Sequence, residues 1–297
     1  MSRFDYKLLH ALSMVMQEQS FERAANVLCI SQSAVSQRIK QLEEFVAHPV
    51  IVRGQPIVPT SIGQQLLSHY KQVQRLESVL LPELLPDEPS HTVKLSIAVN
   101  ADSVATWFLG VMTPLLKVHP IELNLLIANE ERTLEKLKSG EAFAAVSSHP
   151  QALGGYQSFE LGKMEYILVA TPEFKQRYFA DGLNTDSLRH APGVSFDPKD
   201  DMHIRFIKEH FGLSAGDYPR HTVRSSEAFV EMAKQGVAYS LLCPLQVQNE
   251  LQSGELINIL PEKSMVETLY WHCWVMVRGI YKKVSQHVVK EGREVLG

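Results

Sequence analysis

Small polar and cationic side chains gather between Ser31 and Lys40. At helical spacing they would share one face, opposite an apolar face that includes Val35 and Ile39. Hydroxyls, amides and cations without bulk suit the major groove of DNA, where they can bond phosphates and base edges. We therefore predict DNA contacts at Ser31, Gln32, Ser33, Ser36, Gln37, Arg38 and Lys40.

Two short helices with a tight break would position this face. Phe21–Leu28 has apolar residues at helical spacing, and Ser31 can cap a second helix over Ser31–Phe45. This pattern predicts a helix-turn-helix, although from the two helices alone an ordinary surface hairpin stays open. Two β-prone runs flank Gly54–Pro56 and predict a wing, where Arg53 either reaches DNA or is a solvated charge.

A second group of polar residues opens two later helices. Asn100–Ser103 follows a predicted strand, and Ser225–Glu227 repeats the arrangement further along the chain. Free amides at a helix start favour an anion such as a carboxylate. The alternative is that these are ordinary first-turn residues, since Asp, Ser and Glu favour any helix start.

A long helix separates the two groups. Thr60 can cap a helix over Ser61–Leu81, which ends before Pro82 and a proline-rich linker. Its apolar residues alternate in steps of four and three, which predicts a coiled-coil seam with a second copy, although a lone amphipathic helix has a similar stripe. The seam comprises Ile62, Leu66, Val73, Leu76 and Leu80, with His69 as a polar break that sets the register.

After Thr92, strand-like runs alternate with helical stretches. This alternation predicts mainly parallel α/β structure, either one large sheet or two lobes with a ligand cleft at the carboxyl ends of the strands. The length of 297 residues independently favours two domains.

Composition excludes several classes. Net charge is −4, and cations outnumber anions by only one over residues 1–65, so we expect several copies to share the binding of DNA. No apolar run approaches the ~18 residues of a membrane span. Three distant cysteines indicate a reduced, cytoplasmic protein in which Cys29 and Cys243 are packing thiols. We expect no catalytic residue, cofactor or metal; His203, His210 and His221 lack metal-site spacing and are interpreted as solvated or capping.

The run AANVLCISQSAVSQRIKQLEEF, followed by PVIVR, Pro-Thr and Gly63, resembles the DNA-binding domain of LysR-type transcriptional regulators. Domain lengths extend the resemblance over the whole chain. The blocks NADSVATW, DDMH, SSEAFV, SGELI and LYWH are similar to a branch of that family that responds to lysine and arginine and controls genes of basic amino-acid export or uptake.

The resemblance implies three segments. These are a winged helix-turn-helix (1–60), a dimerisation helix with hinge (61–90), and a periplasmic-binding-protein-like effector domain of two Rossmann-like lobes (91–297), with lobe 1 at about 91–161 and 266–297 and lobe 2 at about 162–265. It also implies double-stranded DNA and homodimers or homotetramers as partners, with RNA polymerase as a further candidate and no membrane.

Within this framework, Asp102 or Glu227 would take the α-ammonium of an amino acid. Glu130, Asp197, Asp200 and Asp201 are candidates for its basic side chain. The predicted effector residues are Asn100, Asp102, Ser103, Thr106, Ser147, Ser148, Phe196, Asp197, Ser225, Ser226 and Glu227. The alternatives are another small-acid effector, an enzyme on a two-lobed fold, or a solute-binding protein, which would need an export signal.

Overall fold

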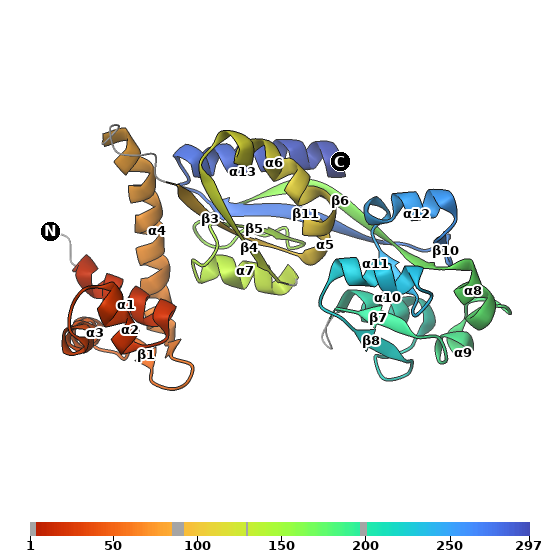
Figure 1. Ribbon diagram of the computed structural model, residues 1–297, viewed down its shortest axis with the longest axis horizontal. Coiled ribbons are helices and arrows are strands. Elements are labelled where there is room, and N and C mark those ends of the chain that lie inside the picture. The colour runs from red at the N-terminus through yellow and green to blue at the C-terminus, as the bar shows by residue number, and fades with distance from the viewer. Residues whose placement is uncertain (1–3, 85–91, 129, 197–200) are drawn as a thin grey trace.

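The computed structural model describes residues 4–84, 92–128, 130–196 and 201–297. Figure 1 shows an N-terminal domain, the long helix α4 and a two-lobed domain arranged in a row. The N-terminal domain comprises α1 (Tyr6–Glu18), α2 (Phe21–Val27), α3 (Gln32–Val46), β1 (Ile51–Val52) and β2 (Val58–Pro59). The predicted helix-turn-helix is confirmed, and the second helix begins one residue after its predicted cap.

Each of the first three helices begins at a short polar side chain that accepts a backbone N–H. Asp5, Ser20 and Ser31 accept from residues two or three positions ahead, which satisfies part of the exposed first turn. The turn between α2 and α3 passes through Cys29, which has a positive φ of 53° and is exposed. The prediction that Cys29 packs in the core is therefore wrong, because the tight turn directs this residue outward; Cys243 is buried as predicted.

The predicted wing is confirmed as an antiparallel pair in which Ile51 faces Pro59 and Val52 faces Val58. Its position is set by Gln19, the residue after α1. The Gln19 amide accepts from the Ile57 N–H at 2.9 Å and donates to the Ile57 carbonyl at 3.0 Å and the Met16 carbonyl at 2.9 Å. One side chain thus joins the wing to the helical part of the domain.

Helix α4 (Ser61–Leu84) begins against the wing. The Thr60 hydroxyl accepts from the Gly63 N–H at 3.1 Å, as the predicted cap requires. Gly63 is buried, and a Cβ there would lie 1.9 Å from the Val50 carbonyl oxygen, so only glycine allows this approach.

The apolar stripe of α4 packs largely within its own chain. Ile62 and Leu66 join the core of the N-terminal domain, and Leu66 is only 7% exposed, so it contacts its own domain rather than the predicted seam. His69 contacts the rings of Phe4 and Tyr6, which corrects its interpretation as a register device. Val73, Leu76 and Leu80 retain more exposure, and their contact with a second copy stays a prediction.

Helix α4 also contacts the domain that follows it. The Arg75 guanidinium donates to the Gly140 carbonyl at 2.6 Å, and the Gln64 amide donates to the Ser139 carbonyl at 3.0 Å. Helix α4, which follows the N-terminal domain, is thereby joined directly to lobe 1.

Lobe 1 is a mixed sheet covered by helices on both faces. Figure 1 shows α6 and α13 over one face and α7 over the other. Its elements are β3 (Val93–Val99), α5 (Ala101–Ser103), the π-helix η1 (Val104–Phe108), α6 (Leu109–Val118), β4 (Ile121–Ile127), α7 (Glu130–Lys138), β5 (Ala144–Ser147), the first part of β6 (Tyr156–Ala170), the last part of β11 (Met265–Trp274) and α13 (Gly279–Leu296).

Lobe 2 is built around the other ends of β6 and β11. Its further elements are α8 (Pro172–Tyr178), α9 (Thr185–Leu188), β7 (Gly193–Ser195), α10 (Asp201–Phe211), β8 (Arg220–Thr222), α11 (Ser226–Lys234), β9 (Ser240–Leu242), the short 3-10 helix η2 (Pro244–Gln246), α12 (Gln248–Ser253) and β10 (Ile257–Asn258). Within the described ranges, no helix is both long and apolar enough to span a bilayer.

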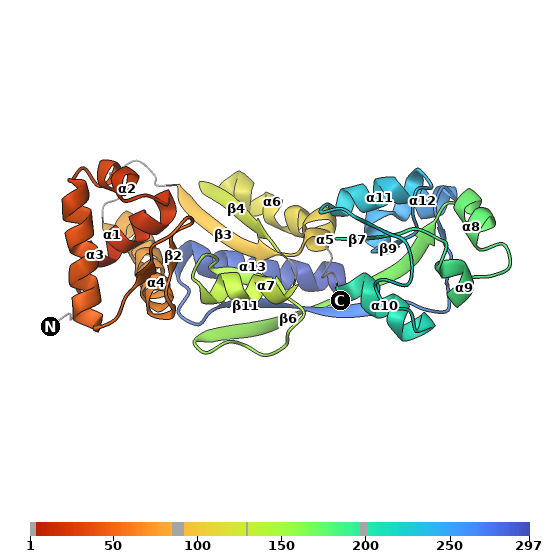
Figure 2. The ribbon, with the colours of Figure 1, turned by 90° about the horizontal axis from the view of Figure 1, so that it is seen from below.

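The prediction of mainly parallel sheets is wrong. In the order β10-β6-β11-β5-β3-β4, only β3 forms parallel pairs, with β4 and β5, while β6 and β11 pair antiparallel with their neighbours. The long pair β6–β11 runs through both lobes, as Figure 2 shows. The two crossings between lobes are therefore hydrogen-bonded to each other, which ties the lobes along one ribbon.

Candidate nucleic-acid interface and interlobe ligand site

Helix α3 lies at the outer end of the molecule, away from both lobes (Figure 2). Its buried face consists of Val35, Ile39 and Leu42. Of the predicted DNA-contacting residues on the helix, Gln32, Ser33, Gln37 and Lys40 are exposed and Ser36 and Arg38 are half-buried. The predicted polar face is therefore turned outward, where a duplex can reach it.

Neighbouring groups already orient some of these side chains. The Ser31 hydroxyl accepts from the Ala34 N–H at 3.1 Å and lies 2.9 Å from the Ser33 hydroxyl oxygen, so Ser31 acts mainly as the cap. Lys40 forms an ion pair with Glu44 at 3.7 Å. Arg38 has no ion-pair partner among the described residues, which leaves its charge available for a phosphate or base.

Arg53 follows β1 on the wing and is exposed. Its guanidinium carbon lies 5.7 Å from the centre of the Phe21 ring, within the range of a cation–π contact. The contact holds the arginine against the start of α2 without using its N–H donors. Both a phosphate contact and a solvated charge remain compatible with this position.

The second site lies where the two lobes meet. Figures 1 and 2 place the start of α5 in lobe 1 beside the start of α11 in lobe 2. The Ser226 hydroxyl donates to Asp102 Oδ1 at 2.5 Å, although the residues are 124 positions apart. The predicted helix starts are thus brought together, and Asp102 links one lobe to the other.

Asp102 is a carboxylate in an unfavourable environment. Burial raises its pKa above the ordinary value, and the charge of Glu227 acts in the same direction. Hydrogen bonds from Ser226 and Tyr166 partly offset this effect. No lysine or arginine of the described residues pairs with it, and its described hydrogen-bond donor is the neutral hydroxyl of Ser226.

Asn100 provides a second polar group at this junction. It follows β3 directly and is 6% exposed, yet its side-chain oxygen has no hydrogen-bond partner in the described part of the chain. The register Ala98–Ala145 between β3 and β5 places Ser147 level with Asn100 at the same sheet edge. Ser147 is buried, and its hydroxyl accepts from the His149 N–H at 3.3 Å.

Two predicted effector residues instead use their hydroxyls inside lobe 1. Ser103 is fully buried and donates to the Met164 sulfur at 3.7 Å. The Thr106 hydroxyl donates to the Asp102 carbonyl at 2.6 Å within the π-helix η1. Both residues therefore shape the backbone around Asp102. A π-helical turn is uncommon and often marks a functional site.

The lobe 2 side is less enclosed. Ser225 caps α11 by accepting from the Ala228 N–H at 3.2 Å and donates to Glu227 at 2.8 Å, and Glu227 is exposed. Phe196 follows β7 and packs against the apolar cluster of lobe 2. Ser148 is half-buried. Asp197 and Asp200 lie outside the described residues, as do the side chains of Glu130 and Asp201.

Sequence reasoning missed two residues of the junction. The Tyr166 hydroxyl on β6 acts to lower the pKa of Asp102, and the Gln246 side-chain oxygen lies 3.2 Å from the Ser226 hydroxyl oxygen. Tyr166 belongs to an apolar strand, and Gln246 follows a proline in a short helix, so neither carried a local signal. Their roles depend on which chain segments meet at the junction.

The three histidines do not form a metal site. No group of three or more His, Cys, Asp or Glu among the described residues could hold a metal ion. His203 is buried against Tyr239, which corrects the expectation of a solvated or capping residue. Burial and the nearby Arg220 lower the pKa of His203 to about 3, so its ring is neutral at ordinary pH.

The chain is similar to known proteins over its whole length. Residues 6–64 match the family of bacterial regulatory helix-turn-helix proteins, lysR family, and residues 89–278 match the LysR substrate binding domain. The HTH-type transcriptional regulator ArgP of Aeromonas salmonicida is 54% identical over 296 residues, which are 100% of this chain and 99% of that protein.

Two solved structures are also similar. ArgP from Mycobacterium tuberculosis has a TM-score of 0.86 at 29% identity, with 97% of each chain covered. Full-length LysG from Corynebacterium glutamicum with bound effector Arg has a TM-score of 0.80 at 30% identity, with 98% of this chain and 99% of that chain covered.

Proposed function

The chain belongs to the LysR family of transcriptional regulators, and on that premise we propose that it binds operator DNA and responds to a basic amino acid held between its lobes. The family is one of DNA-binding regulators, which excludes the alternative of a small-molecule enzyme. The relative LysG has been solved with bound arginine. Arginine and lysine are therefore the first effectors to test.

One observation gives the main support for an amino-acid effector. Asp102 is a half-buried carboxylate between the lobes that accepts a hydrogen bond from the neutral hydroxyl of Ser226, and no described lysine or arginine pairs with it. An ammonium group of an incoming amino acid would provide the cation that this carboxylate lacks. An acid without an amine would not, so the absence of a described cationic partner for Asp102 favours an amino acid over another small-acid effector.

The carboxylate of the same amino acid needs donors. The first turns of α5 and α11 meet at this junction, and backbone N–H groups at helix starts attract carboxylates. The Asn100 oxygen, buried and without a described partner, can accept a second donor from the ligand. Ligand contacts to both lobes would bias the angle at which they meet.

The proposal includes assembly. The N-terminal segment carries little net positive charge, so two or four copies on repeated half-sites would supply the affinity. Val73, Leu76 and Leu80 on α4 are the residues we propose for contact between copies. We further propose target genes in basic amino-acid transport or metabolism, a cytoplasmic location, and contact with RNA polymerase at the promoter.

The direct test is a DNA-binding titration with DNA from upstream of a neighbouring transport gene, with and without arginine or lysine. Ser33→Ala and Arg38→Ala should each weaken binding by about 1–3 kcal/mol, because they remove base or phosphate contacts from an exposed face. Lys94→Ala is the matched control, because it also removes a cation but lies on β3, far from α3, and it should leave DNA binding unchanged. Unchanged DNA binding by both α3 variants would contradict the assignment of the recognition helix.

A further inference from the structure

A cavity lies in lobe 1, apart from the junction that holds Asp102. It is open to solvent on one side, has a volume of about 610 Å³ and is lined by α13, the first residues of β6 and the segment after β11. Ligand pockets for small molecules commonly fall between about 300 and 1,000 Å³. The cavity is therefore large enough for a ligand of its own.

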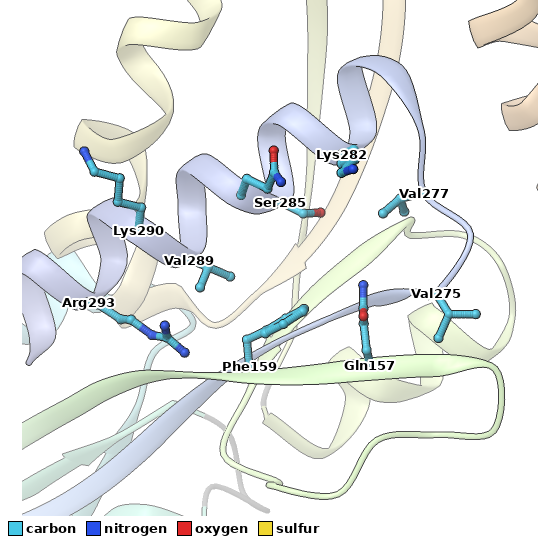
Figure 3. Close-up of a pocket in the computed structure, with 10 residues that line it drawn as sticks. Gln157, Phe159, Val275, Val277, Lys282, Ser285, Val289, Lys290 and Arg293 are labelled. Atoms are coloured by element: carbon cyan, nitrogen blue, oxygen red, sulfur yellow. The ribbon is translucent and has the colours of Figure 1, made fainter.

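The walls of this cavity are apolar at their centre. Figure 3 shows Phe159 rising from β6 toward α13, with Val289 on the helix facing it and Val277 to one side. Phe159, Val277 and Val289 are half-buried, so their apolar surface is shared between the lobe and the cavity. An apolar ligand body that covered these side chains would remove this surface from water.

The polar part of the lining is cationic. Lys282 and Arg293 lie toward opposite ends of the cavity on α13 (Figure 3), and no carboxylate belongs to the described lining residues. Arg293 is held in place because its Nε donates to the Glu160 carbonyl at 2.8 Å, while its two terminal nitrogens have no described carboxylate partner. Lys290 points away from β6 and pairs with Glu291 at 2.8 Å.

The cavity adjoins the contact between lobe 1 and α4. Val277 lines the cavity and also lines the narrow gap that contains Arg75, Leu76 and Val79 of α4. A ligand against Val277 would therefore lie next to the helix that carries the DNA-binding domain. A ligand in the cavity could therefore change the position of α4 relative to lobe 1 and so affect DNA binding.

We propose that this cavity is a second ligand site, for a small anion with an apolar body such as an aromatic carboxylate. The anionic group would pair with Arg293, with Lys282 at the far end for a longer ligand, and the ring would lie against Phe159, Val277 and Val289. The chemistry is opposite to that of the interlobe site, where a buried carboxylate requires a cation. Binding here is independent of the proposed amino-acid response.

Calorimetric titration of the full chain with 2-naphthoate tests the site, with the neutral 2-naphthamide as the matched probe. We expect one 2-naphthoate to bind per chain. The wild type should bind the amide about tenfold more weakly than 2-naphthoate, and the Arg293→Gln variant should bind 2-naphthoate about tenfold more weakly than the wild type does. In each case one partner of the charge-assisted hydrogen bond is missing. Lys283→Gln removes a neighbouring exposed cation outside the cavity and should bind as the wild type does. Val289→Trp should fill the cavity and abolish binding.

Three results would overturn the proposal. The first is that 2-naphthoate does not bind at millimolar concentration. The second is that the wild type and the variants Arg293→Gln and Val289→Trp all bind it with equal affinity. The third is that saturating arginine displaces the probe, which would place it in the interlobe site. Arg293 and Lys283 are exposed, so these two variants should fold even where the tryptophan variant does not.

Discussion

Replacing Asp102 by asparagine separates the charge of this residue from its shape. In the wild type the Ser226 hydroxyl oxygen lies 2.5 Å from Asp102 Oδ1. Asparagine keeps an oxygen that can accept this hydrogen bond, but it carries no charge to neutralise an ammonium. Removing one partner of a buried, hydrogen-bonded charge pair costs about 2–5 kcal/mol. Because the hydrogen bond survives, we expect the lower part of that range, about 2–3 kcal/mol, which weakens arginine binding about 30- to 150-fold.

The same substitution should not destabilise the ligand-free protein. Burial raises the pKa of Asp102, so the folded chain keeps this proton to a higher pH than the unfolded chain does. Between the two pKa values the folded state binds more protons, and its stability falls as pH rises. Ionisation of this carboxyl therefore costs stability as the pH rises, and Asp102→Asn, which cannot ionise, should melt at an equal or higher temperature at neutral pH.

Calorimetry and thermal melts with arginine measure both effects. At a concentration near 100 times the wild-type Kd, arginine should stabilise the wild type by about 2.7 kcal/mol and Asp102→Asn by less than about 1 kcal/mol. Glu227→Gln is the matched control, since it removes an exposed carboxylate near the same junction. Unchanged arginine affinity in Asp102→Asn, or a loss confined to Glu227→Gln, would refute the assignment of the ammonium to Asp102.

Four further predictions concern arginine binding by the wild type and the replacement of two glycines and one glutamine. Arginine affinity should fall as pH is lowered through the raised pKa of Asp102, because the protonated carboxyl no longer attracts an ammonium; a flat calorimetric profile would contradict this. Gly63→Ala should lower the melting temperature by the equivalent of about 1–3 kcal/mol, since its Cβ would lie 1.9 Å from the Val50 carbonyl oxygen. Gly110→Ala, with nothing within 4 Å, should instead gain up to about 1 kcal/mol from helix propensity. Gln19→Ala should cost about 1 kcal/mol in thermal melts and weaken DNA binding, because the wing loses its hydrogen bonds to that amide.

The helix-turn-helix could be predicted because its signals are local. Ser31 caps α3 through a bond to Ala34, three residues away, and Val35, Ile39 and Leu42 form its buried face at helical spacing. Caps and periodicity depend on neighbours within one or two turns, so the sequence contains them directly. The predicted polar face of α3 is outward for the same reason.

The stripe on α4 shows where local pattern is insufficient. An apolar stripe indicates that a helix packs against another surface, but it does not identify that surface. Leu66 and His69 contact the N-terminal domain of their own chain, and Arg75 contacts lobe 1. A seam between two copies would have required nearly the same residue types.

The residue types of the interlobe site were visible in the sequence, and their meeting was not. Sequence alone determined that Asp102 and Ser226 each lie in the first turn of a helix, because capping chemistry acts over a few residues. Only the tertiary structure decided that they bond each other across 124 positions, with Tyr166 near enough to influence the pKa of Asp102. The antiparallel pairing of β6 with β11 was equally undetermined, since strand partners are selected by the surfaces that whole segments bury together.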